Sequence, residues 1–344
     1  FYAGNNLTTG GLTAVGYAAG SAVETGIGNV FMGELSGTSV TSNNNTAVGS
    51  QALTTCVGGH SNSSFGHDAG RLLTGSRNTC IGNDAGAAAT STDDCTLIGN
   101  AAGGGGTMTG HDNTIIGSNA GNVVTGGRNT IVGTSSGATG TLLTTGTDNV
   151  IIGFQNRANS GGLTNSIVIG ENVTAQGNNE FTFGSGNNDS NIVFGATSIN
   201  APSDERYKEE ITTSTAGLSF INDLRPVTFK WKKEKDVPSD HEAYVEGSDK
   251  RVMLSTGEIN HGFIAQEVKT AIDAHSEIKD GFRMWSEDKR YDNDDNLISG
   301  GRQRLAPSEL IPILTKAVQE LSAENDTLKT EIAAIKTRLD ALED

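Results

Sequence analysis

Short hydrophobic runs, each closed by a glycine, recur through the first two hundred residues. The clearest copies read NTAVG at 45–49, NTCIG at 78–82, NTIIG at 113–117 and NTIVG at 129–133. A run of this kind between turn-forming residues is typical of a short β-strand, and a fixed period indicates a stacked repeat. Most of the closing glycines are 16 to 18 residues apart, at Gly16, Gly33, Gly49, Gly66, Gly82, Gly99, Gly117, Gly133, Gly153 and Gly170.

The clearest repeats begin with Asn and end with Gly. We expect the Asn to accept a left-handed backbone at the start of the strand. We expect the Gly to supply a positive φ or to let another backbone approach closely. The adjacent apolar pairs Ile115-Ile116, Ile131-Val132 and Ile151-Ile152 predict strands that are covered on both faces.

One repeat carries only two or three large apolar side chains. That is too few to offset the entropy lost in ordering about seventeen residues. Stacking the repeats, and winding three chains together, would bury more surface. The sequence therefore predicts a mainly β repeat fibre over residues 1–200, as a trimeric β-roll or triple β-helix. Gly184 and Gly195 are closer together than the earlier repeats, which indicates the end of the rod.

The composition changes near residue 200. Residues 1–200 contain no Lys and no Pro, whereas every Lys, every Pro and both Trp residues follow Ala201. Residues 309–344 then show apolar positions at alternating steps of four and three, which favours a coiled-coil helix over an amphipathic helix on a globular face. The seam consists of Leu314, Val318, Leu321, Asn325, Leu328, Ile332, Ile335, Leu339 and Leu342.

Charge and cysteine usage remove several classes of function. The formal net charge of −16 disfavours nucleic acid as a partner. No apolar stretch is long enough to span a bilayer, so no membrane insertion is expected. Cys56, Cys80 and Cys95 are odd in number and read as small buried hydrophobes. We interpret the repeat-half histidines as solvated loop residues, so neither a metal nor another cofactor is expected. They are His60, His67 and His111.

Four ordered motifs occupy the second half. They read SDERYKEEI from Ser203, LRPVTFKWK at 224–232, HGFIAQEV at 261–268 and LIPILTKAVQEL at 310–321. Together they resemble the C-terminal intramolecular chaperone, a self-cleaving serine peptidase family of phage tailspikes, neck appendages and endosialidases. The repeat half is similar to the β-roll heads of trimeric autotransporter adhesins and to phage fibre shafts. The resemblance implies a homotrimer with an α+β chaperone domain at 201–308 and a coiled coil at 309–344.

The same resemblance implies one self-cleavage, at the Pro202–Ser203 bond, with Ser203 as nucleophile and Lys208 as its base. A serine hydroxyl needs a neighbouring base to take its proton, and a lysine can serve when burial lowers its pKa. Asp204 and Arg206 are expected to support the site, Arg206 as a donor to the oxyanion. Gln266 and Glu267 are further supporting residues. The alternative is that Ser203-Asp204 is only an N-cap.

The function expected from these features is a tail fibre or tailspike component of a virion, used for host attachment. Its partners would be two further copies of the chain, other virion tail proteins and a host-surface receptor, expected to be a glycan. The chaperone part would be released in the host cytoplasm after assembly. Two alternatives remain: a cellular trimeric surface adhesin, and a structural fibre whose C-terminal domain is a non-cleaving trimerisation foldon.

Overall fold

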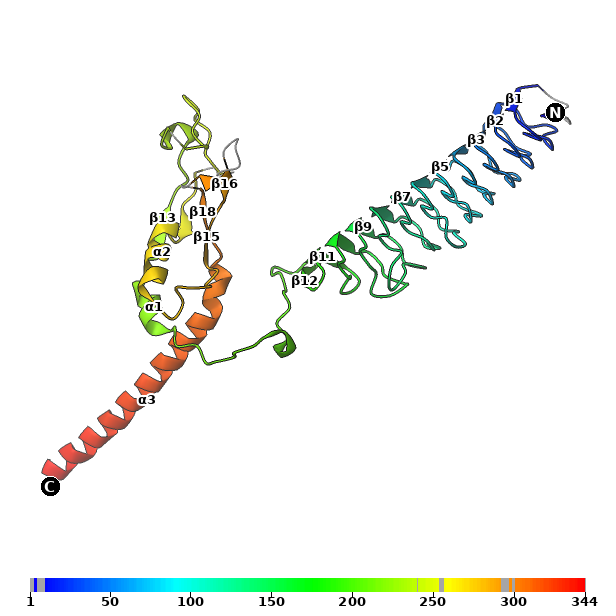
Figure 1. Ribbon diagram of the computed structural model, residues 1–344. Helices are drawn as coiled ribbons and strands as arrows, with labels where there is room; N and C mark the ends of the chain where they lie inside the picture. The colour runs from blue at the N-terminus through cyan, green and yellow to red at the C-terminus, as the bar shows by residue number, and fades with distance from the viewer. Residues whose placement is uncertain are drawn as a thin grey trace. The chain divides into compact units, whose positions relative to one another are not determined.

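The computed structural model describes residues 3–4, 10–239, 241–253, 257–291, 297–298 and 301–343. It divides into two compact units, Phe1–Tyr207 and Lys208–Asp344. The first is a β-solenoid and the second is a small α+β unit that ends in a long helix (Figure 1). The predicted fold class is therefore confirmed. None of the described helices combines the length and hydropathy needed to cross a bilayer.

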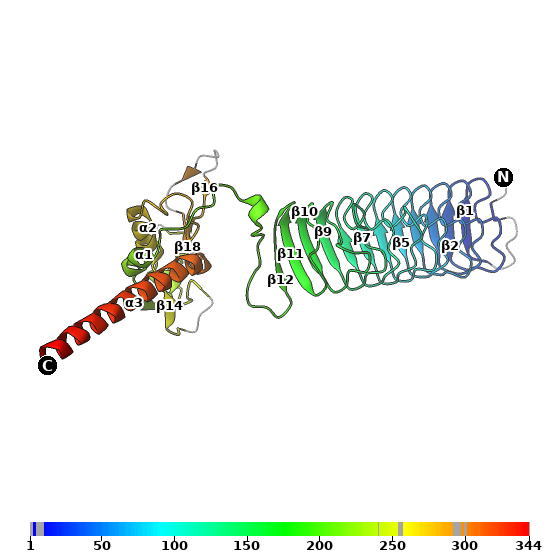
Figure 2. The same ribbon diagram turned by 90° about the horizontal axis from the view of Figure 1, so that it is seen from below.

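The solenoid places one short strand of each turn in a single stacked sheet. Strands β1 to β11 pair in parallel, and β12 returns antiparallel to β11, which ends the parallel stack (Figure 2). The strands are β1 (Leu12–Val15), β2 (Asn29–Met32), β3 (Thr46–Val48), β4 (Ser63–Phe65), β5 (Thr79–Ile81), β6 (Thr96–Ile98), β7 (Thr114–Ile116), β8 (Thr130–Val132), β9 (Val150–Phe154), β10 (Ile167–Glu171), β11 (Glu180–Ser185) and β12 (Asn188–Val193).

The coil of a single chain encloses its own core. In each turn the middle strand residue points inward, as Ile115, Ile131 and Ile151 do, and all three are fully buried. Two further inward columns run beside it, one of which contains Ala102 and Ala120. Each turn thus buries three or four side chains against its neighbours. Turns of one chain therefore supply both walls of this inner core.

The closing glycines combine a positive φ with a close approach of the backbone of the next turn. Gly33 has φ of +135° and Gly117 has the same value, a region that other residues rarely adopt. A methyl group on Gly33 would lie 2.5 Å from the carbonyl oxygen of Gly49 on the next turn. Both the positive φ and the close backbone approach are therefore confirmed.

The Asn that opens each repeat does something the sequence did not indicate. The left-handed residue is the one before it, such as Asp112 or Arg128. The Asn itself is buried and bridges turns: Asn113 Oδ1 accepts from the backbone N–H of Asn129 at 2.9 Å, and Asn113 Nδ2 donates to Gly126 O at 2.9 Å. We call this column the Asn ladder. It consists of Asn29, Asn45, Asn62, Asn78, Asn113, Asn129 and Asn149, with Cys95 in the place of one Asn.

The outward face of the sheet stays uncovered in a single chain, so the prediction of strands covered on both faces is not met within one copy. A row of register-matched apolar residues runs along this face, spaced by one strand separation of ~4.8 Å. Met32 is 44% exposed and Ile152 is 36% exposed. We call this row the outer stripe. It consists of Val15, Met32, Val48, Phe65, Ile81, Ile98, Ile116, Val132, Ile152 and Ile169.

The three cysteines lie inside the solenoid as free thiols. Burial raises the pKa of Cys56 and of Cys95 to about 11 and that of Cys80 to about 12. A thiol with so high a pKa is a poor nucleophile and a poor metal ligand at neutral pH. They act as the small buried hydrophobes that the sequence predicted.

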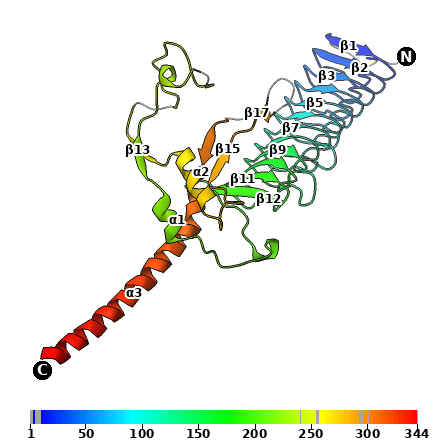
Figure 3. The same cartoon turned by 60° about the vertical axis from the view of Figure 1, so that its left-hand side comes forward.

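The second unit gathers its helices around a small core (Figure 3). Phe220 of α1, Val268 and Ile272 of α2, and Ile313 of α3 are all buried in it. The helices are α1 (Leu218–Asp223), α2 (Ala265–Ala274) and α3 (Leu310–Glu343), with 3₁₀ turns η1 (Glu205–Tyr207, in the first unit), η2 (Glu234–Asp236) and η3 (Pro307–Glu309). The strands pair as β13 (Val227–Phe229) with β14 (Asn260–Gly262), β15 (Trp285–Glu287) with β18 (Gln303–Leu305), and β16 (Arg290–Tyr291) with β17 (Leu297–Ile298).

Helix α3 has two different halves. Its first turns pack on α1 and contribute Leu310, Ile313 and Ala317 to the buried set. From Leu321 onward nearly every described side chain is exposed, including the apolar seam residues Leu328 and Ile332 at 51% and 52%. Isolated helices gain most of their stability from packing an apolar face. An exposed apolar seam of this length is typical of a helix that pairs with other helices.

Candidate cleavage site

The backbone before the predicted cut is fixed to the end of the solenoid. Asn191 of β12 donates its N–H to Asn200 O at 2.9 Å, and Asn200 donates its N–H to Asn191 O at 2.7 Å. Ala201, Pro202 and Ser203 follow in extended, irregular backbone and are exposed. The Pro202–Ser203 bond therefore lies two residues beyond an anchored position and is open to attack.

Asp204 begins the 3₁₀ turn that follows the bond. Its Oδ1 accepts from the backbone N–H of Arg206 at 2.9 Å, and its carbonyl oxygen accepts from Tyr207 N at 3.1 Å. The carboxylate also pairs with the guanidinium of Arg206, and this pairing raises the pKa of Arg206. Asp204 thus performs the capping role. Because Arg206 is held by Asp204, it is not free to receive an oxyanion in this arrangement.

The two residues of the predicted dyad fall on opposite sides of the division between the units. Ser203 belongs to the solenoid unit, and Lys208 is the first residue of the second unit. Both side chains are exposed in the single chain. The burial that lowers the pKa of a catalytic lysine is therefore not supplied by one copy.

Gln266 and Glu267 lie in the first turn of α2, and both are exposed. Glu267 pairs with Arg225, with Arg225 Nε 3.0 Å from Glu267 Oε2, and this hydrogen bond lowers the pKa of Glu267. The pair joins the LRPVTFKWK and HGFIAQEV motifs, which also meet where Thr228 of β13 faces His261 of β14. Glu267 thus contributes to assembling the unit through its contact with Arg225.

The fourth motif contributes a contact that the sequence did not indicate. Glu320 of α3 accepts a hydrogen bond from Leu218 N at 2.8 Å, through Oε2. This satisfies a free N–H at the start of α1, a helix with no side-chain cap of its own. The seam spacing placed Glu320 off the coiled-coil core but could not show which helix it would meet.

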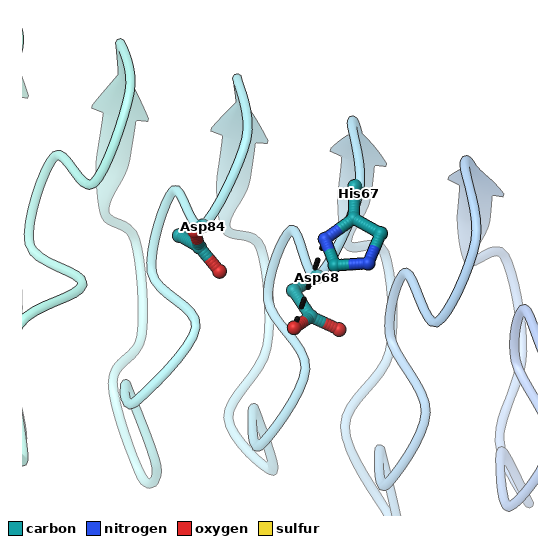
Figure 4. Close-up of side chains that lie close together, drawn as sticks. All are labelled: His67, Asp68 and Asp84. Carbon is teal, nitrogen blue, oxygen red and sulfur yellow. Dashed lines mark ion pairs between the residues drawn. The ribbon is translucent and has the colours of Figure 1, made fainter.

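One group of metal-ligand side chains lies on the solenoid, away from the cut. His67, Asp68 and Asp84 come from two adjacent turns, and their ligand atoms lie within 4.8 Å of one another (Figure 4). Asp68 also faces Arg71, with Oδ2 3.7 Å from the guanidinium Nε. Because Arg71 already neutralises part of the charge of Asp68 and His67 is exposed, we interpret this group as a polar cluster on the surface.

The fold and the motif contacts define a class: a β-solenoid fibre followed by an α+β unit with an exposed, coiled-coil-type helix. Comparison with protein families then identifies the second part. The family model described as chaperone of endosialidase matches residues 203–276, so the C-terminal region carries a domain of that family. No curated protein matches the chain, and no solved structure does.

Proposed function

We propose that the C-terminal unit assembles three copies of the chain, directs folding of the β-solenoids, and is then released by self-cleavage at Pro202–Ser203. The observation that carries this proposal is where the family match begins. It starts at Ser203, the residue assigned as nucleophile, directly after an anchored and exposed Pro202.

The chemistry of the cut needs only groups near this bond. Ser203 Oγ attacks the Pro202 carbonyl carbon, the C–N bond breaks, and the proton lost by the hydroxyl reaches the new amine through Lys208. Water then hydrolyses the ester and leaves a carboxylate on Pro202 and a free hydroxyl on Ser203. A lysine acts as a base only where its surroundings favour the neutral form, and Lys208 is exposed in one copy, so we propose that cleavage follows trimer formation.

Two surfaces support association of copies. The seam of α3 and the outer stripe of the solenoid are both apolar and exposed in one chain. Burying apolar surface contributes about 25 cal/mol per Å². The spacing of the seam is compatible with two or three strands, and the family resemblance favours three. A second and third copy would cover both surfaces.

The solenoid also explains why a chaperone is useful. Successive turns have nearly the same inward side chains, so adjacent chains could associate out of step at little cost in energy. A trimerising unit at one end fixes a common frame and raises the effective concentration of the three chains. Cleavage then leaves a fibre that need not retain its assembly domain.

A denaturing gel of freshly expressed protein tests the cut. We expect two bands and a new N-terminus at Ser203, with Ser203→Ala giving one full-length band. Ser198→Ala is the matched control, because Ser198 is also exposed and lies in the same exit segment. A single full-length band from the unaltered chain would instead support a non-cleaving foldon.

We further propose that the mature solenoid is part of a virion fibre that attaches to a host-surface glycan. The chaperone domain favours this assignment over a cellular adhesin, because the family it resembles serves phage tail proteins. Binding of the purified fibre to intact cells, and its loss after glycan removal from those cells, tests attachment. Equal binding to stripped and intact cells would contradict a glycan receptor.

A further inference from the structure

A polar cavity of about 400 Å³ lies at the C-terminal end of the solenoid, wholly within the first unit. Its walls come from the last turns, the β11–β12 hairpin and the segment that leads to the cut. Arg157, Ala201 and Pro202 are all among the residues that line it. The cavity therefore brings a permanent positive charge to the bond that the proposed reaction breaks.

Arg157 is rigidly placed but incompletely paired. Its backbone N–H donates to Val173 O at 2.8 Å and its carbonyl accepts from Ala175 N at 3.0 Å, which fixes it between two turns. Gly140 leaves room for its stem, since a methyl group there would lie 2.9 Å from Arg157 Cδ. In the described part of the chain the buried Nε has no hydrogen-bond partner, and Nη2 makes one long contact of 3.5 Å to Asn172 Oδ1.

Leaving a buried guanidinium donor unpaired is unfavourable, by about 1–3 kcal/mol for a typical buried group. Asp189 also lines the cavity, and its Oδ2 accepts from Gln176 Nε2 at 2.9 Å. Arginine stays charged at every relevant pH, and its planar fork matches the two oxygens of a carboxylate. The lining of the cavity therefore includes a charged side chain that could pair with a further carboxylate.

We infer that Arg157 binds the carboxylate that cleavage creates on Pro202. This inference rests on the cut proposed above. Before the cut the Pro202 carbonyl is a neutral amide. Afterwards it is a carboxylate with a pKa near 3.5, hence ionised at neutral pH. The Asn191–Asn200 backbone bonds keep the new terminus beside the cavity. Cleavage thus adds a charge-assisted contact that closes the end of the fibre.

The test follows removal of Pro202 from the cleaved fibre by a carboxypeptidase, read by mass spectrometry. Arg157→Gln should speed removal by about tenfold, the effect of losing one charge-assisted contact. Arg128→Gln is the matched control, because Arg128 is an exposed solenoid arginine paired with Asp148. Unchanged removal in Arg157→Gln, or equal acceleration in both variants, would overturn the inference.

A second comparison separates this contact from a general packing role. In the uncleavable Ser203→Ala protein, Arg157→Gln should change the melting temperature much less than it does in the cleaved fibre. Equal losses in both forms would show that Arg157 only supports the fold.

The inference can be tested even if the chain does not cleave itself. Residues 1–201 contain no proline, so a proline-specific endopeptidase applied to the Ser203→Ala protein gives a solenoid fragment ending at Pro202. The same carboxypeptidase comparison then applies. A single full-length band from the unaltered chain would count against self-cleavage, whereas rapid loss of Pro202 from the fragment irrespective of Arg157 would count against capture of the carboxylate.

Discussion

At the scale of single residues, the Asn ladder is the feature that most constrains the solenoid. Each ladder side chain satisfies a backbone N–H and a backbone carbonyl on the following turn, deep inside the coil. Buried backbone groups must be paired, because leaving one unpaired costs about 1–3 kcal/mol. The ladder is the reason that an Asn recurs at the start of most of the repeats.

Cys95 interrupts this ladder and offers a test of it. Its Sγ lies 3.5 Å from Asn113 N and 3.3 Å from Gly110 O, both long contacts for a weak acceptor and donor. We expect Cys95→Asn to restore two ordinary hydrogen bonds and stabilise the solenoid by about 1 kcal/mol. Chemical denaturation would measure this.

Removing an Asn from the ladder is the converse test. Asn129→Ala should destabilise the solenoid by about 2–4 kcal/mol, because Asn149 N and Gly146 O both lose their partner. Asn100→Ala, which removes an exposed Asn outside the ladder at a position without a positive φ, should change stability little. Similar effects from the two alanine variants would contradict the ladder.

The sequence predicted the role of the closing glycines but not that of the Asn ladder. The reason is that the first depends on local backbone conformation and the second on contacts between turns. A positive φ or close approach at Gly33 follows from the local chain, whereas the role of Asn113 depends on the register between turns. From the sequence, Arg157 is only one of four arginines in the repeat half, because its cavity forms from segments up to 50 residues apart, from Arg157 to Tyr207.

At the scale of elements, the contact between α1 and α2 depends on a titratable side chain. His275, just after α2, is 2.8 Å from Asp223 of α1 through Nε2 and 3.1 Å from Glu277 through Nδ1. The hydrogen bond to Asp223, followed by that to Glu277, raises the pKa of His275. The protonated ring therefore links the two helices.

This contact predicts a pH dependence of stability. A raised folded-state pKa gives stabilisation that is fully present below the unfolded value of about 6.5 and is lost as pH rises through the folded pKa. Melting of the full chain between pH 6 and pH 8 should show this loss. His275→Gln should remove it, whereas His261→Gln, at an exposed position, should keep it. A pH profile unaffected by His275→Gln would contradict the link.

Helix α3 carries the prediction about assembly. Ile332→Asp places a charge in the exposed seam, where association would have to bury it, and should prevent or strongly weaken oligomer formation. Thr330→Asp lies off the seam and should leave association intact. Sedimentation of the Ser203→Ala protein would measure both. Unchanged mass in Ile332→Asp would show that the seam does not join copies.

At the scale of the whole molecule, the sequence predicted the two halves because they differ in kind. A fixed period with little charge gives a stacked coil, and a Lys- and Pro-containing segment with helical spacing gives an α+β unit. The period could not show whether one chain or three enclose the core. That depends on the inward columns, where small residues such as Ala102 and Ala120 let a single coil close tightly.

The proposed dyad at the Pro202–Ser203 bond is a second case in which the sequence could not show the surroundings of a residue. Motif order led to Ser203 and Lys208 as a proposed dyad, and both side chains are exposed in one copy. Sequence spacing locates reactive groups along a chain. Their protonation depends on neighbours that assembly would bring.

The repeated inward columns also bear on how such a molecule changes over generations. Because each turn presents nearly the same two faces to its neighbours, a tandem duplication or loss of one repeat leaves matching surfaces at the junction. The length of the solenoid can then vary in steps of one turn, while both of its ends, including the segment with the Pro202–Ser203 bond, keep their geometry.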